Sequence, residues 1–348
     1  MAFRKRWFRL SQRLIATAKA KAFRRSSNDS VVAVTSFALS GGTPKRIMVF
    51  GDSNAFRPGG GRTCWPVLLE DKDSDHLHVF NESCKGRTTQ YDTGERNGLG
   101  VIRDKLAAYT PLDYVIVMLG TNDMKSQYGP PRAADIADGI DQILDFIDMQ
   151  GNGIEPILLT PPPLGDVTSG ELAGAQARIP HVAVAYRLLA MKRALRLVDI
   201  HAILDSHTDL EADRIHLNAV GRQKVADAVW ANLQDVTASA RVTGFCSLPK
   251  GADFNLTWNA VGADTFYYCV RKNGDIIGRT MNTSFMVTAP AIGDHFTVEA
   301  VDFSQNTGPA STTITYNEER AIECKLQNTL NDNQRQLPRR SQELAMYR

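Results

Sequence analysis

A short apolar run near the start of the chain ends in glycine, carboxylate and hydroxyl: Arg46-Ile47-Met48-Val49-Phe50-Gly51-Asp52-Ser53-Asn54. Its continuous apolar character predicts a buried strand, and a strand that stops there delivers its last side chain to a fixed point. In an open α/β sheet that point is the crevice beyond the carboxyl ends of the strands, where ligands bind. Ser53 is therefore either a nucleophile or the N-cap of a following helix, and other residues must decide between them.

Further short apolar runs follow and alternate with helical patterns. The predicted strands are residues 46–50, 77–81, 113–119, 154–160 and 197–200. One predicted helix carries apolar residues at helical spacing, namely Ile136, Ile140, Ile143 and Ile147. The last helix is marked in the same way by Val225, Val229 and Leu233. This series predicts an α/β fold whose parallel sheet has helices on both sides and its sites at the strand ends.

The sequence changes after about residue 240 to threonine, tyrosine, phenylalanine and valine at period two. In the run Phe254-Asn255-Leu256-Thr257-Trp258 the apolar residues alternate with polar ones and should share one buried face. Further predicted strands are residues 266–270, 284–287 and 295–302, and Asn273-Gly274 marks a turn. These closely spaced strands predict a small all-β sandwich over residues 241–316. The polar segment 317–348 predicts a loosely packed or disordered tail.

The composition is that of a globular protein. With 348 residues, 43% of them hydrophobic, about two domains are expected. No apolar run reaches the roughly 18 to 20 residues that a spanning helix needs. Nine Lys or Arg residues precede the first acidic residue, so the remaining 31 basic and 38 acidic residues leave a net charge of −7. An acidic body argues against a nucleic-acid partner, and the five scattered cysteines predict neither a disulfide framework nor a metal site.

The leader, residues 1–40, begins with a basic amphipathic pattern. Phe3, Trp7, Leu10 and Leu14 recur at helical spacing among arginines and lysines within residues 1–28. Three interpretations remain open: a helix that docks on a membrane surface or a protein partner, a presequence-like targeting segment, and a solvated extension without function. The sequence favours an exported or surface-associated protein over a cytoplasmic one. It is also compatible with an oligomer.

Three further places along the chain carry groups that could act with Ser53. Asp213-Arg214-Ile215-His216 puts a carboxylate where it can orient one imidazole nitrogen while the other faces a substrate. The same pattern also fits a helix N-cap beside a surface histidine. Gly120-Thr121-Asn122-Asp123 follows the third predicted strand, so an amide can reach a developing oxyanion there, although an Asx turn is an alternative. Gly86 follows the second strand and offers an unobstructed backbone NH, or is a plain loop glycine.

Taken together, these residues resemble the SGNH, or GDSL-type, hydrolases over roughly residues 44–236. The matching blocks are Gly51-Asp52-Ser53-Asn54, Gly86, Gly120-Thr121-Asn122-Asp123 and Asp213-x-x-His216. The arylesterase and acyltransferase branch is similar in Gly86-Arg87-Thr88-Thr89, in Lys125 after the third block, and in Pro161-Pro162-Pro163-Leu164. The resemblance implies a flavodoxin-like three-layer α/β/α domain at residues 41–238. Residues 241–316 are similar to fibronectin type III modules, notably in Thr297-Val298-Glu299-Ala300-Val301-Asp302 and the Asn306-Thr307-Gly308 turn.

The resemblance implies a carboxylic ester hydrolase with a serine nucleophile. The implied catalytic residues are Ser53 as nucleophile, His216 as base and Asp213 as orienting acid. The implied oxyanion donors are the Ser53 NH, the Gly86 NH and the Asn122 side chain. The candidate substrate-pocket residues are Asn54, Thr121, Lys125 and Ile215. Asn54 stands where many members carry leucine, so we expect it to change which acyl chain fits.

The expected substrate is a small-molecule or glycan ester of a short acyl group, acetyl first, and neither a cofactor nor a metal is implied. The alcohol part of the ester could be an aryl, alkyl or sugar hydroxyl. We expect hydrolysis through an acyl-enzyme intermediate, and acyl transfer from this intermediate to another alcohol is also possible. Two alternatives remain: a lysophospholipase or other lipid-directed hydrolase that uses the leader as its anchor, and a non-catalytic adhesion protein with a decayed hydrolase fold. Because every candidate catalytic residue precedes residue 217, we expect a protein truncated near residue 238 to keep its small-ester activity.

Overall fold

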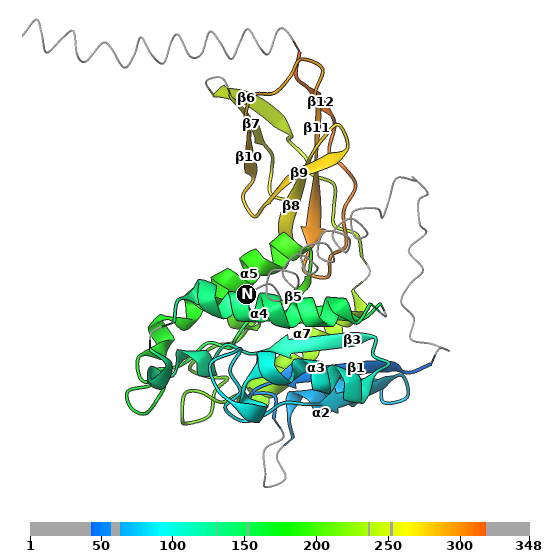
Figure 1. Cartoon of the computed structure of the whole chain (residues 1–348). Helices are drawn as coiled ribbons and strands as arrows, with labels where there is room; N and C mark the ends of the chain where they lie inside the picture. Colours follow the sequence, from blue (N-terminus) through cyan, green and yellow to red (C-terminus); the bar gives the residue numbers. More distant parts are fainter. Residues whose placement is uncertain are drawn as a thin grey trace, which may run out of the picture. The chain divides into compact units, whose positions relative to one another are not determined.

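The computed structural model describes residues 43–56, 63–129, 131–151, 153–235, 237–250 and 253–317. The predicted leader helix lies outside these ranges, as does the predicted tail apart from Asn317. The described chain forms one five-stranded parallel sheet with helices, followed by two antiparallel sheets (Figure 1). None of the helices in this part of the chain has the length and apolar character needed to cross a membrane.

The parallel sheet confirms the predicted α/β fold. Its strands are β1 (Lys45–Gly51), β2 (Leu77–Asn81), β3 (Tyr114–Met118), β4 (Glu155–Leu159) and β5 (Arg196–Val198). They lie in the order β2-β1-β3-β4-β5, and every neighbouring pair is parallel. This is the flavodoxin-like order, in which the direction of winding reverses between β1 and β3. A crevice therefore opens beyond the carboxyl ends of these two strands.

Helices cover both faces of the parallel sheet, because alternate side chains of each strand point to opposite sides. The helices are α2 (Trp65–Glu70), α3 (Gly98–Tyr109), α4 (Ala133–Met149), α5 (Ile179–Arg193), α6 (Ile200–Ile203) and α7 (Ala219–Gln234). Short 3₁₀ turns occur at Gly94–Arg96, Asn122–Met124, Ser126–Tyr128 and Ala175–Ala177. Met48 and Phe50 of β1 pack in one core with α3, α4 and α5, whereas Ile47 and Val49 pack in a second core with α2 and α7. The result is the expected three-layer arrangement.

The C-terminal part forms two antiparallel sheets with a core between them. Its strands are β6 (Cys246–Lys250), β7 (Asp253–Thr257), β8 (Thr265–Lys272), β9 (Asp275–Thr280), β10 (Ser284–Val287), β11 (His295–Asp302) and β12 (Ile314–Thr315). The sheet orders are β10-β7-β6 and β12-β11-β8-β9. Phe254, Leu256 and Trp258 are all buried, as their alternation predicts. An all-β module is thus present, while the fibronectin type III likeness stays a prediction.

Residues after β11 contact the edge of the parallel sheet. The Leu197 NH of β5 donates to the Phe303 carbonyl oxygen at 3.0 Å. The buried Asn232 amide of α7 donates to the carbonyl oxygens of both Leu197 and Phe303, each at 3.3 Å. The rings of Phe303 and Phe266 stack at 4.8 Å, and Phe266 belongs to the same apolar core as Leu197. The β5 edge is therefore covered by the C-terminal module.

Candidate active site

Ser53 lies directly after β1, at the crevice where the winding of the sheet reverses. A Cβ atom on Gly51 would lie 2.9 Å from both the Ala55 Cβ and the Ser83 Oγ, so the strand can only end here with glycine. The Asp52 carbonyl oxygen accepts hydrogen bonds from the NH groups of Ala55 and Phe56, at 3.2 and 3.0 Å. This tight turn holds Ser53 in a fixed position at the strand end.

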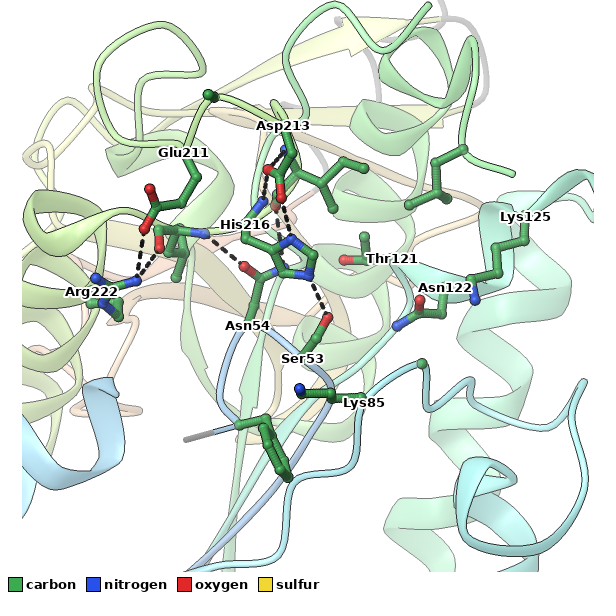
Figure 2. A pocket seen from close by; sticks show the side chains of 16 residues that line it. Ser53, Asn54, Lys85, Thr121, Asn122, Lys125, Glu211, Asp213, His216 and Arg222 are labelled. Carbon is green, nitrogen blue, oxygen red and sulfur yellow. Dashed lines mark hydrogen bonds and ion pairs between the residues drawn. The ribbon is translucent and has the colours of Figure 1, made fainter. Parts of the chain in front are cut away.

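Three side chains from two distant parts of the sequence form one hydrogen-bonded series (Figure 2). The His216 Nε2 atom lies 2.9 Å from the Ser53 Oγ. The His216 Nδ1 atom lies 2.6 Å from the Asp213 Oδ2. The other Asp213 oxygen accepts from the backbone NH groups of Ile215 and His216, both at 2.9 Å. A hydroxyl, an imidazole and a carboxylate in this order are what general-base activation of a serine requires.

The Asp213 carboxylate has the charge that this arrangement needs. Burial raises the pKa of Asp213, but the hydrogen bonds from the His216 amide and imidazole and from the Ile215 amide more than offset it. The net result is a pKa below the usual value for aspartate. Asp213 is therefore ionised at neutral pH and can hold the Nδ1 proton of His216.

The backbone between the acid and the histidine is strained. Arg214 has a φ of 63°, a left-handed conformation that non-glycine residues seldom adopt. Its carbonyl oxygen is held by the Gly165 NH at 2.9 Å. This bend turns the chain so that the Asp213 carboxylate meets the backbone NH groups and the ring of His216. Strain of this kind persists where the surrounding contacts over-determine the conformation.

Two loops bring further donors to Ser53. Gly86, after β2, has a φ of 78°, which favours glycine. In the described part of the chain, the NH groups of Gly86 and Ser53 have no hydrogen-bond partner. The Asn122 amide nitrogen faces Ser53 (Figure 2) and donates to the Arg87 carbonyl oxygen at 3.2 Å and to the Asp52 Oδ2 at 3.3 Å. The two free NH groups and this amide can together receive a developing negative charge.

Buried carboxylates connect the loops that carry these donors. Burial raises the pKa of Asp52 to about 6, although the hydrogen bond from the Asn54 amide lowers it. Burial likewise raises the pKa of Asp123 to about 6, against the lowering effect of hydrogen bonds from Thr89. Thr89 donates to Asp123 through both its NH and its hydroxyl, at 2.9 and 2.5 Å. The loops after β1, β2 and β3 are thus linked by side chains that water does not reach.

A cavity of about 730 Å³ opens over Ser53 (Figure 2). It is lined by every residue that the sequence predicts for the site: Ser53, Asn54, Gly86, Thr121, Asn122, Lys125, Asp213, Ile215 and His216. The prediction missed seven other lining residues, namely Phe56, Lys85, Leu172, Glu211, Ala212, Leu217 and Arg222. Most of the missed residues are chain neighbours of the motifs and could have been found by extending each block. Leu172 could not, because its segment carries no recognisable motif.

The side chains of two predicted pocket residues have polar partners within the chain, whereas the residues that the structure describes provide none for a third. Asn54 is 4% exposed, and both ends of its amide are hydrogen-bonded to the chain beside His216, so they are not available to an acyl group. Lys125 forms an ion pair with Glu171 at 3.0 Å, so its charge is already compensated. Thr121 is buried and its Oγ1 has no partner in the described part of the chain. Among the described residues, no three His, Cys, Asp or Glu side chains gather to hold a metal ion.

Comparison with known proteins identifies the family. The model of the GDSL-like Lipase/Acylhydrolase family matches residues 49–224, about half of the chain and all four blocks. The chain therefore belongs to this family, which is one of acyl-ester hydrolases. A search of curated proteins found no match.

Solved structures resemble the hydrolase part of the chain. One, 21% identical with a TM-score of 0.51, covers 55% of this chain and 98% of that chain, which supports the fold alone. A carbohydrate acetylesterase family member from Sinorhizobium meliloti is 26% identical over 55% of this chain and 97% of its own, with a TM-score of 0.48. The M. smegmatis aryl esterase is 25% identical over 56% of this chain and 100% of its own, with a TM-score of 0.49. At these TM-scores neither likeness says what this chain acts on.

Proposed function

We propose that this protein is a serine esterase that hydrolyses short-chain acyl esters. The observation that carries the proposal is the series Ser53, His216 and Asp213, with distances of 2.9 and 2.6 Å between the polar atoms. Family membership supports the same reaction class. An adhesion protein with a decayed site would not be expected to keep all three groups in register, together with free NH groups beside the serine.

The reaction follows from the roles of these groups. His216 Nε2 takes the Ser53 proton as Oγ attacks the ester carbonyl, and Asp213 stabilises the imidazolium that forms. The oxyanion is received by the NH groups of Ser53 and Gly86 and by the Asn122 amide. His216 then gives its proton to the leaving alcohol, which departs and leaves an acyl-enzyme. Water, or a second alcohol in acyl transfer, attacks this intermediate by the same path in reverse.

The cavity favours a short acyl group. Its apolar lining is limited to Phe56, Leu172, Ala212, Ile215 and Leu217. Charged side chains, including Lys85 and Arg222, line the same cavity. A long acyl chain needs a continuous apolar channel, because packing the chain against charged groups takes water away from them at a cost. We therefore place acetyl esters first, with an aryl or sugar hydroxyl as the alcohol, and rank the lipid-directed alternative below them.

The test of this proposal is the loss of turnover in Ser53→Ala. The variant should retain the wild-type melting temperature, because a hydroxyl at a strand end fills no core volume, and should hydrolyse aryl acetate at a rate near background. A fluorophosphonate should label wild-type protein at Ser53 only. Ser311→Ala is the matched control, since it removes a buried hydroxyl of the C-terminal module without touching the cavity. Label on another residue, or wild-type turnover by Ser53→Ala, would overturn the mechanism.

The substrate class is tested by comparing three esters. Wild-type protein should turn over aryl acetate and O-acetylated sugars with a higher kcat/KM than a long-chain lysophospholipid presented in vesicles or micelles. The reverse ranking would favour the lipid-directed alternative and would leave the serine mechanism intact.

A further inference from the structure

The Asn54 side chain forms a bridge across the catalytic histidine. Its Oδ1 accepts a hydrogen bond from the Leu217 NH at 2.9 Å, and its Nδ2 donates to the Ile215 carbonyl oxygen at 3.4 Å. Figure 2 shows Asn54 beside His216, with the bond to the backbone as a dashed line. Asn54 follows Ser53 in the chain and lies 163 residues before Leu217. One side chain thus joins the nucleophile turn to both flanks of the histidine.

The Asn54 end of this bridge is rigid. Its backbone NH donates to the Asp52 Oδ1 at 2.9 Å, within the tight turn that ends β1. Ala55, the next residue, is held from the other side, since its carbonyl oxygen accepts from the Asn81 amide at 2.8 Å. Asn54 itself is 4% exposed, so its amide bonds form where water does not compete for them.

In the described part of the chain, the backbone around His216 has no hydrogen bond to the turn after β1 other than the Asn54 bridge. His216 stands in a loop, and its side chain is 41% exposed. Its own carbonyl oxygen and NH bond within the same segment, to the Glu211 NH and to Asp213. These local bonds shape the loop but do not fix its distance from Ser53. The Asn54 amide is a direct tie between the two.

We propose that Asn54 is a positioning residue that sets the separation of Ser53 Oγ and His216 Nε2 through the backbone of residues 215–217. This rests on the proposed function and adds to it a positioning role for the residue that follows the nucleophile. It also changes the role expected from the sequence. A side chain whose polar atoms are both used to hold the histidine affects the transition state for every acyl group, rather than the choice among them.

The first test is Asn54→Leu, which has a similar volume but can make neither bond. Proton transfer depends steeply on the Ser–His distance, and a displacement of about 1 Å can cost on the order of 10²-fold in rate. We expect kcat to fall by that order on acetyl, butyryl and hexanoyl esters alike, with KM unchanged. Labelling by a fluorophosphonate should slow by a similar factor, because it needs the Ser–His pair but no acyl recognition. A change in KM that depends on acyl length would instead assign Asn54 to substrate binding and overturn the proposal.

The second test is Asn54→Asp, which differs by one terminal group. The aspartate carboxylate can still accept a hydrogen bond from the Leu217 NH. Its second oxygen, however, faces the Ile215 carbonyl oxygen, and two acceptors repel each other. Protonation of the carboxylate restores a donor at that position. We therefore expect the ratio of variant kcat to wild-type kcat to rise as pH falls from 8 to 5. Asn54→Leu should show a ratio that does not change with pH. A constant ratio for Asn54→Asp would contradict the bridge, and this variant decides the matter if Asn54→Leu fails to fold.

A matched control separates positioning from stability. Asn232 is another buried amide with bonds to backbone and to the Ser304 hydroxyl, far from Ser53 in the fold. Asn232→Leu should lower the melting temperature and leave kcat within about twofold of wild type. Ser53→Ala is assayed in parallel: full turnover there would remove the proposed function itself. If turnover depends on Ser53 but Asn54→Leu keeps the wild-type kcat, only the proposed role of Asn54 is overturned.

Discussion

Asn122 donates in two directions before any substrate binds. Its amide reaches the Arg87 carbonyl oxygen and the Asp52 carboxylate at 3.2 and 3.3 Å, the long end of the hydrogen-bond range. Weak bonds of this kind orient the amide without holding it strongly. An oxyanion is a better acceptor than a neutral carbonyl, so the amide can exchange a long bond for a shorter, charge-assisted one.

Asn122→Ala should accordingly lower kcat by roughly 10² to 10³ with little change in KM, because the donor acts mainly on the transition state. Steady-state kinetics on aryl acetate give both constants. Asn232→Ala, which removes a buried amide outside the cavity, provides the comparison. A change confined to KM would make Asn122 a ground-state binding residue.

The sequence predicts the residues of the site better than their connections. The Asp213 to His216 spacing and the strand-end serine are visible in the chain, because each depends on a few neighbouring residues. The Asn54 bridge depends on an amide meeting a backbone 163 residues away. No local pattern encodes such a contact, so an asparagine beside the nucleophile suggests a pocket residue until the fold is known.

At the scale of elements, the loops after β1, β2 and β3 behave as one unit. The Arg87 guanidinium is 1% exposed and donates to the carbonyl oxygens of Gly51, Glu82 and Glu95. It also lies over the Phe50 ring, 4.3 Å from the centroid. Burial lowers the pKa of Arg87 from its high usual value, and the nearby acidic groups partly offset this. A buried cation with this many backbone partners keeps the Gly86 loop in register with the serine turn.

The buried Asp52 makes stability depend on pH in a direction that can be measured. Its pKa is about 6 in the folded protein and lies near 3.8 in the unfolded chain. Between these values the unfolded chain releases the proton that the folded protein keeps, so the free energy of unfolding falls as pH rises from 4 to 6. The Asp52→Asn variant has no carboxylate at this position, so its free energy of unfolding does not fall in this way; the difference amounts to up to about 3 kcal/mol at neutral pH.

We therefore expect the free energy of unfolding of Asp52→Asn, relative to wild type, to increase between pH 4 and pH 7. Urea unfolding at several pH values measures the difference, and the exposed Asp138→Asn should show none. A difference that shrinks with rising pH would mean that the folded protein prefers the Asp52 carboxylate.

The strands that the sequence failed to predict are all edge strands, although the edge strands β2, β5 and β10 were predicted. β6, β9 and β12 were not expected from the sequence, and all three lie at sheet edges. Edge strands bury less of their surface, so their apolar alternation is weak: Ile276 and Ile277 of β9 are adjacent and both exposed. The central strands β7 and β11 alternate more clearly, because one face of each packs in the core between the sheets, whereas β8 is buried on both faces.

At the scale of the whole molecule, the C-terminal module is more than an appended domain. Phe266, Tyr267, Cys269 and Val301 belong to the same apolar core as the hydrolase helices α4 and α5. The Gln305 amide also donates to the Leu195 carbonyl oxygen at 2.9 Å. The sequence-based expectation of an independent hydrolase domain assumed a small contact between the two parts. The contact in the structure includes shared apolar core and is larger than that.

A protein that ends at residue 238 should therefore be less stable, while its chemistry stays intact. The truncation exposes apolar surface and leaves the Leu197 NH without its Phe303 partner, so the melting temperature should fall by several degrees. Turnover per fluorophosphonate-reactive site should match full-length protein, because no cavity residue lies beyond Arg222. Phe303→Ala in the full chain should lower the melting temperature more than Ile277→Ala does. Lower turnover per active site would show that the module helps to shape the cavity.

The 163 residues between Ser53 and His216 also determine when the site can form. Ser53 lies in a different β-α unit from Asp213 and His216, and parallel strands pair only after their long crossovers have closed. During synthesis the serine turn emerges from the ribosome well before its base, and at the usual pace of about 5 to 20 residues per second the delay is roughly 8 to 33 seconds. The nascent chain therefore carries a serine that cannot attack esters until the loop before α7 has left the ribosome.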